Sequence, residues 1–578
     1  MVSEPGASGG GDQVVALITG AGGRVGIVGA GHRRAGPLPD VLHAVAGLES
    51  AGVRWAWWAA HSTYPLLLEA GIRPARAWDA AEVHRLLHGG WDADPARVWA
   101  GAHGLDPARM PAAPRGDLFD TESELPHARL VRPDGYLRPD AVTDGWADSD
   151  ERLLGYADAL LQCVQRQRGQ ADEAGGRLAA TIRAESAAAM LCVELERDGL
   201  PVDRQCLVDL VTPLSGPREE RDAAVLAQVR ALMPGGDRPG SGGLPVVDLR
   251  NPASVREMLA RVGIDVPSTR KHVLEAFRDV HPVVPALLTW RRQERIATTY
   301  GLRWIQERIG PDDRLRGHWT ACDGAAGRMT ADAGLHNLPA MLREGVAAEA
   351  GHVFVRADLG QIEPRVLAVV SGDDALAQAA RADDLYAPVA QRLGVERAQA
   401  KVAVLAAMYG QRSGTAGQAL RGLERAYPVA MRYLDQAYAA GVQARPVRTH
   451  GGRLIRLDAS LATKPPGVDR VLDAARGRFA RNAVIQGAAA ELFKAWAATV
   501  RADLTRTGWP RPGTDPARIV LCLHDELLIH TPRQQAEHVA GLVDQALQAA
   551  ARRWSGDAPV RFIADLSIVS RWSQAGHV

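Results

Sequence analysis

Several stretches of the chain alternate apolar runs with abrupt polar interruptions, and these stretches define its predicted elements. Residues 13–31 (QVVALITGAGGRVGIVGAG) contain two short apolar runs around a glycine turn. A dinucleotide-binding loop would need a helix after these glycines, whereas Gly29, Gly31 and Pro37 break the chain there. The pattern therefore favours a β-hairpin, with a nucleotide site as the alternative.

A helical pattern begins near residue 176. Apolar positions recur at helical spacing until Gly199 and Pro201, and residues 254–309 continue as predicted helices. The second stretch is rich in cations: Arg270, Lys271, Arg278, Arg291, Arg292, Arg295, Arg303 and Arg308. Each residue alone is explained by a solvated helix face, but the cluster is also a candidate surface for the phosphates of a nucleic acid.

Two apolar runs are interrupted by acidic residues. In LCLHDELLIH (521–530), His524, Asp525 and Glu526 interrupt a predicted buried strand. In HVFVRADLGQIEPRVLAVVSGD (352–373), Asp358 stands at a predicted strand end, and apolar residues then resume at helical spacing. A polar group in an apolar run must be hydrogen-bonded, directed into a cleft or neutralised by a cation.

Asp358 and Asp525 therefore suggest a metal site. If their strands are neighbours, the two carboxylates converge and repel each other unless divalent cations lie between them. Oxygen ligands without a nearby cysteine cluster favour Mg²⁺ over Zn²⁺. The alternative is that each aspartate caps an adjacent element.

A third segment, residues 395–414 (VERAQAKVAVLAAMYGQRSG), is predicted to be a helix. Arg397, Lys401, Leu405 and Tyr409 recur every four residues and so form one stripe. Two cations, an apolar residue and an aromatic would suit a triphosphate, a sugar and a base in that order. An ordinary amphipathic surface helix would show the same spacing.

Composition narrows the class of protein. The chain has 578 residues, 68 Lys plus Arg against 67 Asp plus Glu, and a net charge of +1, so a polyanion would have to be held by local patches. Its cations include only four lysines: Lys271, Lys401, Lys464 and Lys494. Five cysteines without a CxxC pair favour a reducing, cytoplasmic setting over a disulfide framework. The N-terminal residues do not resemble a signal peptide, and no apolar run suggests a membrane span.

The three segments, in this order, resemble motifs A, B and C of the A-family DNA polymerases, the family of bacterial DNA polymerase I. Motif A, DYSQIELR, corresponds to DLGQIEPR (358–365), motif B, RxxxKxxxFxxxYG, to residues 397–410, and the HDE of motif C to residues 524–526. Further family-like segments are GRMTADAGLHNLP (327–339), RTHGGRLIRL (448–457), RFARNAVIQGAAAELFK (478–494) and ERDGLPVD (196–203). The resemblance extends from about residue 180 to the C-terminus.

The resemblance implies a DNA-directed DNA polymerase, a nucleotidyltransferase of DNA replication or repair, that acts on primer–template DNA and deoxynucleoside triphosphates. Two Mg²⁺ ions would be held by Asp358 and Asp525. Glu526 and Lys401 would join the two aspartates as catalytic residues, and Lys401 would also grip the triphosphate. The nucleotide would also meet Arg397, Leu405, Tyr409, Gln361, Glu363 and Tyr386, with Glu363 excluding ribonucleotides. The residues implied to contact DNA are Arg328, Asn337, Arg478, Asn482, Gln486 and His524.

Some positions depart from the family pattern. Leu405 replaces an aromatic residue that stacks on the sugar, Gly360 and Pro364 replace Ser and Leu, and Tyr386 stands where His is usual. None of these changes removes a metal ligand. They nevertheless keep open a second hypothesis, a catalytically weakened or decayed protein that only binds primer–template DNA.

The predicted fold class is α/β and α+β multidomain: an exonuclease-like (ribonuclease H-like) α/β domain followed by a polymerase hand. Residues 1–165 would form the first domain with its linker, 176–310 the thumb, 311–365 and 500–578 the palm, and 366–499 the fingers with connecting palm helices. The early strands carry no D-x-E motif, FDTES (119–123) follows no apolar strand, and Leu160 replaces the Asp of a late exonuclease motif. We therefore expect a vestigial domain without 3′–5′ proofreading, no 5′-nuclease domain, and a monomer.

Overall fold

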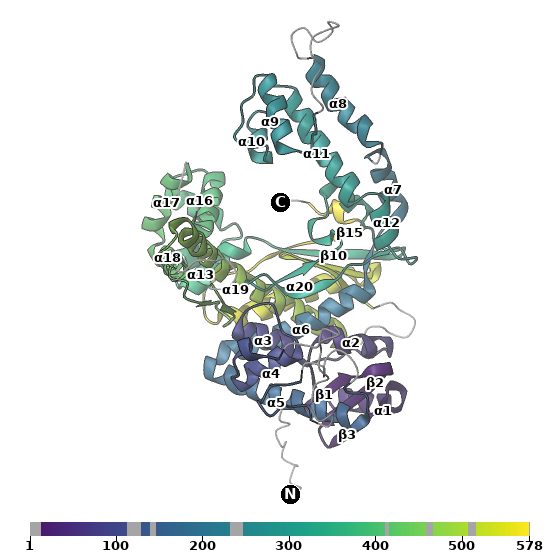
Figure 1. Cartoon of the computed structure of the whole chain (residues 1–578). Helices are drawn as coiled ribbons and strands as arrows, with labels where there is room; N and C mark the ends of the chain where they lie inside the picture. The colour runs from purple at the N-terminus through teal and green to yellow at the C-terminus, as the bar shows by residue number, and fades with distance from the viewer. Residues whose placement is uncertain are drawn as a thin grey trace. The chain divides into compact units, whose positions relative to one another are not determined.

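The computed structural model describes residues 13–111, 129–138, 141, 146–214, 216–231, 247–410, 415–457, 466–506 and 516–576. FDTES (119–123) and Lys464 lie outside these residues. The chain divides into two compact units (Figure 1). The first comprises Met1–Gly199, His318–Asp332 and Ala350–Ser570, and the second Leu200–Gly317, Ala333–Glu349 and Arg571–Val578.

The first unit begins with a mixed five-stranded sheet in the order β3-β2-β1-β4-β5. Its strands are β1 (Val14–Thr19), β2 (Arg24–Gly29), β3 (His32–Pro37), β4 (Arg54–Trp57) and β5 (Ala77–Asp79). Strands β1 and β2 pair antiparallel, and the turn between them places Gly22 and Gly23 at φ +67° and +74°. The hairpin predicted over residues 13–31 is confirmed.

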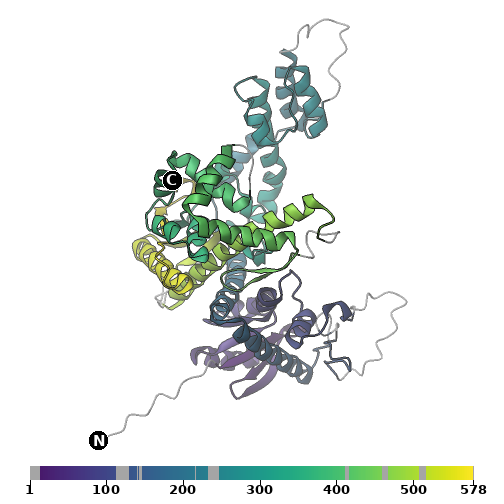
Figure 2. The same cartoon turned by 90° about the vertical axis from the view of Figure 1, so that its left-hand side faces the viewer.

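The helices that pack on this sheet are α1 (Leu38–Ser50), α2 (Ala60–Glu69), α3 (Ala80–His88) and α5 (Asp150–Ala174), and α4 (Pro95–His103) packs on α3 and α5. Helix α5 packs on β1, β2 and β3, and Figure 2 shows it lying alongside the purple strands. Leu160, where the exonuclease pattern has Asp, is fully buried in the shared core with Ile18, Ala56 and Trp58. Its side chain therefore serves packing.

Helix α6 (Gly176–Asp198) follows, and nearly all of its second half is buried. It ends where Gly199 adopts φ +67°, as the sequence predicts. Lys494, one of the four lysines, has a structural role. Its fully buried ammonium donates to Glu185 of α6 at 2.6 Å and to the Ala321 carbonyl at 3.1 Å. This lysine is a structural cation of the core.

A second, four-stranded antiparallel sheet has the order β13-β14-β10-β15. Its strands are β10 (His352–Leu359), β13 (Arg518–Leu523), β14 (Glu526–Pro532) and β15 (Ala564–Val569). Helix α20 (Ala536–Ser555) packs on this sheet and on the long helix α19 (Arg470–Arg506). Among the described residues, this unit also has two small hairpins, β8 (Trp319–Asp323) with β9 (Arg328–Ala331) and β11 (Val447–Arg448) with β12 (Leu454–Ile455).

One strand prediction is wrong in detail. LCLHDELLIH is not one strand but two, because β13 ends at Leu523 and β14 begins at Glu526. His524 and Asp525 form the turn between them, and His524 adopts φ +56°. The polar residues that interrupt the apolar run thus mark a tight hairpin turn, where side chains can leave the core.

Between β10 and β13 the chain is mainly helical. The helices are α13 (Ile362–Ser371), α14 (Asp374–Ala379), α15 (Tyr386–Leu393), α16 (Arg397–Tyr409), α17 (Thr415–Ala426) and α18 (Pro428–Val442), followed by α19. The helix predicted after Asp358 is present as α13, and the helix predicted over residues 395–414 is present as Arg397–Tyr409, while residues 411–414 lie outside the described residues. Arg365 of α13 is buried, and its guanidinium donates to four backbone carbonyls, those of Ala380, Ala382, Asp383 and Arg561.

The second unit is built from α7 (Arg204–Val211), α8 (Arg218–Ala231), α9 (Pro252–Arg261), α10 (Lys271–Glu275), α11 (Val283–Thr299) and α12 (Leu302–Arg308), with the short pair β6 (Leu200–Pro201) and β7 (Arg314–Leu315). Arg250 joins Asp222 and Glu294 across this unit at 2.8 Å each. Of the predicted cationic cluster, Arg278 and Arg303 pair with Glu275 and Glu307 on their own segments.

The fold is mixed α/β and α+β in several parts, as predicted. Among the residues that the structure describes, no helix combines the length and the hydrophobicity needed to cross a membrane.

Candidate active site

The candidate site lies where β10 meets the turn between β13 and β14. In the antiparallel pairing of β10 with β14, Asp358 stands opposite Glu526. The Leu359 N–H donates to the Asp525 carbonyl at 2.9 Å, which fixes the turn beside the end of β10. Residues 358 and 525, far apart in sequence, are thereby placed at the same end of one sheet.

The carboxylates of this group influence one another. Burial and, next, the negative charge of Asp358 together raise the pKa of Asp525 to about 7, with smaller contributions from Glu526 and Glu363. Repulsion of this kind requires neighbouring carboxylates without sufficient counter-charge. The site therefore has an electrostatic demand for cations.

An internal cation, Arg356, meets part of this demand. Its buried guanidinium donates to Asp358 at 2.6 Å, to Glu526 at 2.7 Å and to Asp565 at 3.1 Å. Asp565 is brought in by β15, where it stands opposite Asp358. Glu526 is consequently tied to Arg356.

The stripe predicted on residues 397–409 lies on α16, which begins beside a second polar group. Arg397 forms an ion pair with Asp384 at 2.6 Å. The Gln361 side chain donates to the same carboxylate at 2.9 Å and accepts from the Leu385 N–H at 2.8 Å. Gln361 adopts φ +58°, and the Arg397 guanidinium lies 5.9 Å from the ring centroid of Tyr386.

Further along α16, Lys401 is exposed, Leu405 is half-buried and Tyr409 is 39% exposed. Lys401 forms no ion pair with any residue that the structure describes. An exposed ammonium of this kind is available to a ligand.

Glu363 of α13 is held in place from one side by Arg328 of β9, at 3.2 Å. Its side chain is only 16% exposed, and burial raises the pKa of the carboxyl, although Arg328 and a hydrogen bond from Tyr409 oppose the rise. The Glu363 carboxylate therefore has a fixed position at the start of α13.

The predicted DNA contacts lie at four places in the structure. Arg478, Asn482 and Gln486 recur every four residues along α19, with Arg478 exposed and the two amides half-buried. His524 is exposed at the hairpin turn. Arg328 lies on β9, whereas Asn337 is exposed in the second unit, so the structure does not join Asn337 to the other residues.

Comparison with known proteins identifies the family. The family model "DNA polymerase family A" matches residues 253–574, more than half of the chain. The chain belongs to DNA polymerase family A. The matched segment includes every candidate residue of the site described above.

Similar curated proteins are DNA polymerases I. That of Chloroflexus aurantiacus is 31% identical over 336 residues, which cover 53% of this chain and 34% of the relative. The thermostable DNA polymerase I of Thermus thermophilus is 31% identical over 312 residues, which cover 49% of this chain and 36% of the relative. The chain thus matches about a third of the length of these family A relatives.

A solved structure extends the likeness in fold to nearly the whole chain. The POL domain of Pol1 from M. smegmatis, in complex with DNA primer-template and dNTP, superimposes with a TM-score of 0.70. The alignment covers 98% of this chain and 97% of that one, at 19% sequence identity. At this identity the likeness establishes the fold.

Two residues of the candidate site were not predicted from the sequence: Asp565 and the cation Arg356, which binds the carboxylates. Arg356 interrupts the apolar run VFVRADL just as HDE interrupts its own run, so the same demand for a partner could have singled it out. Asp565 gives no such signal, since only the pairing of β15 with β10 brings it to the site.

Proposed function

We propose that this family A protein is a DNA-templated DNA polymerase that adds deoxynucleotides to a primer 3′ end, in DNA replication or repair. The observation that carries the proposal is the placement of Asp358 beside Asp525, whose pKa is about 7 under the influence of burial and of its neighbour's charge. Membership of family A and the fold shared with a polymerase domain solved with primer-template and dNTP support it.

We further propose that Asp358 and Asp525 hold two Mg²⁺ ions. The donor set fits, because it offers carboxylate oxygens with unbalanced negative charge. When bound, Mg²⁺ would supply activation of the primer 3′-hydroxyl and stabilisation of the pyrophosphate leaving group. Asp358 and Asp525 would hold the ions beside the attacking 3′-oxygen and the leaving phosphate oxygen. Glu526 would act through Arg356, whose guanidinium donates a hydrogen bond to it at 2.7 Å.

The remaining residues would bind the nucleotide. Arg397 and Lys401 would grip the triphosphate, and the exposed Lys401 ammonium would deliver a proton to the leaving group. Leu405 and Tyr409 continue the same face of α16 towards sugar and base. Glu363, fixed by Arg328, would exclude a 2′-hydroxyl. Gln361 and Tyr386 would also contact the nucleotide.

Primer–template DNA would contact Arg328, Asn337, Arg478, Asn482, Gln486 and His524. Side chains of this kind can read minor-groove acceptors that all base pairs share, which suits a polymerase without sequence preference. We assign residues 176–310 to the thumb, 311–365 and 500–578 to the palm, and 366–499 to the fingers with connecting palm helices. We also propose that the protein acts as a monomer in the cytoplasm, a compartment in which five free thiols are stable.

Primer extension with Mg²⁺ tests the function. Asp358→Asn and Asp525→Asn should each lower the extension rate by about 10³-fold or more, equivalent to roughly 4 kcal/mol, while affinity for primer–template is retained. Asp557→Asn, a change of an exposed aspartate after α20, is the matched control and should extend normally. Normal extension by both site variants would refute the proposal.

A second candidate function is a catalytically weakened or decayed protein that binds primer–template DNA. The observation that favours it is Arg356, whose guanidinium takes up hydrogen-bonding capacity of Asp358 that a metal would use. It predicts that the unmodified chain binds DNA but incorporates no nucleotide, so the same assay separates the two functions.

A further inference from the structure

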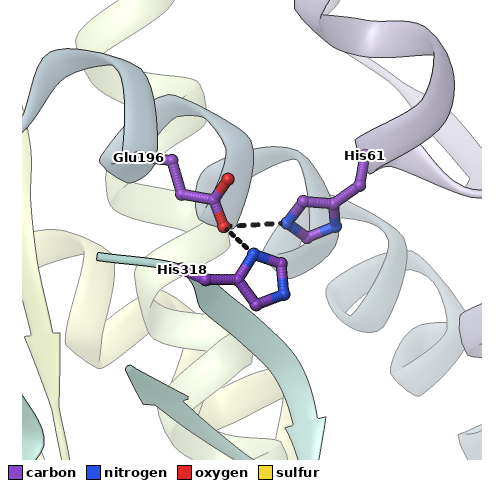
Figure 3. A group of neighbouring side chains, drawn as sticks. All are labelled: His61, Glu196 and His318. Atoms are coloured by element: carbon purple, nitrogen blue, oxygen red, sulfur yellow. Dashed lines mark hydrogen bonds and ion pairs between the residues drawn. The ribbon is translucent and has the colours of Figure 1, made fainter. Parts of the chain in front are cut away.

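Three side chains from separate segments of the first unit converge away from the carboxylate group just described. His61 comes from the first turn of α2, Glu196 from the last turn of α6, and His318 from the residue directly before β8. Figure 3 shows both imidazole rings directed at one carboxylate oxygen. None of the three has a role in the function proposed above.

The distances have the scale of a metal centre. His61 Nε2 lies 3.1 Å and His318 Nδ1 lies 2.8 Å from Glu196 Oε1, and the three possible ligand atoms lie within 4.8 Å of one another. The imidazole centroids are 4.9 Å apart with the rings tilted by 51°. Tetrahedral zinc with bonds of about 2.0–2.2 Å separates its ligand atoms by roughly 3.3 Å, so small side-chain shifts suffice.

The surroundings of this group favour a cation. The backbone N–H of Trp319 donates to Glu196 Oε1 at 2.6 Å and orients the carboxylate. Asp79 and Glu82, both buried, lie near enough for their charges to act on His61. A positive charge at this place is therefore stabilised from several sides.

We propose that His61, Glu196 and His318 form a Zn²⁺ site. Two imidazoles with one carboxylate suit zinc, whereas Mg²⁺ prefers oxygen ligands alone. The His318 side chain is 60% exposed, which leaves an open fourth position for water and a path for the ion. A bound metal would cross-link three segments of this unit: α2, the end of α6 and the start of β8.

The competing account of the same geometry is an ion pair in which a protonated His61 and Glu196 bind each other without metal. The two accounts differ in a measurable way, because only the metal site links zinc affinity to both histidines. His318 is the sharper probe, since an exposed side chain contributes little to folding.

The experiment measures metal binding by the full chain after chelator treatment, in excess Mg²⁺ to fill oxygen-only sites. Zn²⁺ calorimetry should show one site, and Co²⁺ should give the visible absorption of a four-coordinate ion. His61→Ala and His318→Ala should each weaken Zn²⁺ binding by about 100-fold or more, beyond the roughly 10- to 100-fold effect of losing an outer partner. His43→Ala, on the exposed face of α1, is the matched control and should bind like the unmodified chain.

A second measurement guards against misfolded variants. Zn²⁺ should raise the melting temperature of the unmodified chain and of His43→Ala, but not that of Glu196→Gln, which keeps the side-chain shape and loses the anionic ligand. The proposal is overturned if the unmodified chain binds no Zn²⁺ in excess Mg²⁺. It is equally overturned if His318→Ala binds Zn²⁺ with unchanged affinity, because binding would then lie elsewhere.

Discussion

The guanidinium of Arg356 donates a hydrogen bond at 2.6 Å to the carboxylate of Asp358, which lies two residues further along the same strand. Because residues i and i+2 of a strand share a face, β10 presents a cation and a proposed metal ligand side by side. The same guanidinium binds Glu526 and Asp565. Arg356 therefore neutralises in advance part of the charge that would attract Mg²⁺.

Replacement of this cation should strengthen metal binding. In Arg356→Ser we expect the Mg²⁺ concentration at half-maximal thermal stabilisation to fall by about tenfold, the equivalent of roughly 1.4 kcal/mol of lost repulsion between two cations. Without Mg²⁺ the variant should melt below the unmodified chain, since three carboxylates lose their counter-ion. Melting curves across an Mg²⁺ titration measure both effects. Arg303→Ser, which breaks an exposed helical pair, should change neither, and an unaltered Mg²⁺ midpoint in Arg356→Ser would contradict the argument.

The fixed position of Glu363 predicts sugar selectivity. Glu363→Ala should raise the incorporation of ribonucleotides relative to deoxynucleotides by about 10²-fold, since it removes the carboxylate that we propose excludes the 2′-hydroxyl. Arg328→Ala should give a smaller change in the same direction, because it frees the carboxylate from its 3.2 Å partner without removing it. Single-nucleotide incorporation with matched ribo and deoxy substrates gives both ratios. Equal selectivity in Glu363→Ala and the unmodified chain would rule out this role.

Glu491 of α19 provides a pH dependence away from the candidate site. Burial raises the pKa of this carboxyl to about 7, although it accepts hydrogen bonds from Thr449 and from the Gly451 N–H at 2.8 Å. The folded state thus keeps a proton that the unfolded state loses near pH 4.5. Stability from this group is complete below the unfolded pKa and falls as the pH rises through the folded pKa.

Glu491→Gln keeps the shape and removes the titration. Its melting temperature relative to the unmodified chain should therefore rise between pH 5 and pH 8, with an upper limit of roughly 3 kcal/mol in relative stability. Thermal melts in matched buffers measure the difference. Glu537→Gln, on the exposed first turn of α20, should show no such trend. A pH-independent difference for Glu491→Gln would show that the carboxyl titrates near its ordinary value.

Local patterns predicted the elements well and long-range pairing poorly. The hairpin of β1 and β2, the strand end at Asp358 and the helix bearing Lys401 each depend on neighbours within about a dozen residues, the range over which periodicity carries information. Asp565 reaches the site through the register of β10 with β15, some 200 residues apart, and no local signal encodes that register. His61, Glu196 and His318 converge for the same reason, from three segments that look unremarkable separately.

Leu405 supplies the last test, because it stands on the stripe of α16 that we propose faces the nucleotide, at a position where the family pattern has an aromatic residue. Leu405→Phe should lower the KM for deoxynucleotides by a few-fold, since a ring stacked on sugar or base adds about 1 kcal/mol or more of binding. The residue is half-buried, so part of the larger ring can extend towards solvent without overpacking the core. Leu423→Phe, which changes a buried residue of α17, is a size-matched control that should lower stability and leave KM unchanged. A KM unchanged in Leu405→Phe would mean that this face of α16 does not meet the nucleotide.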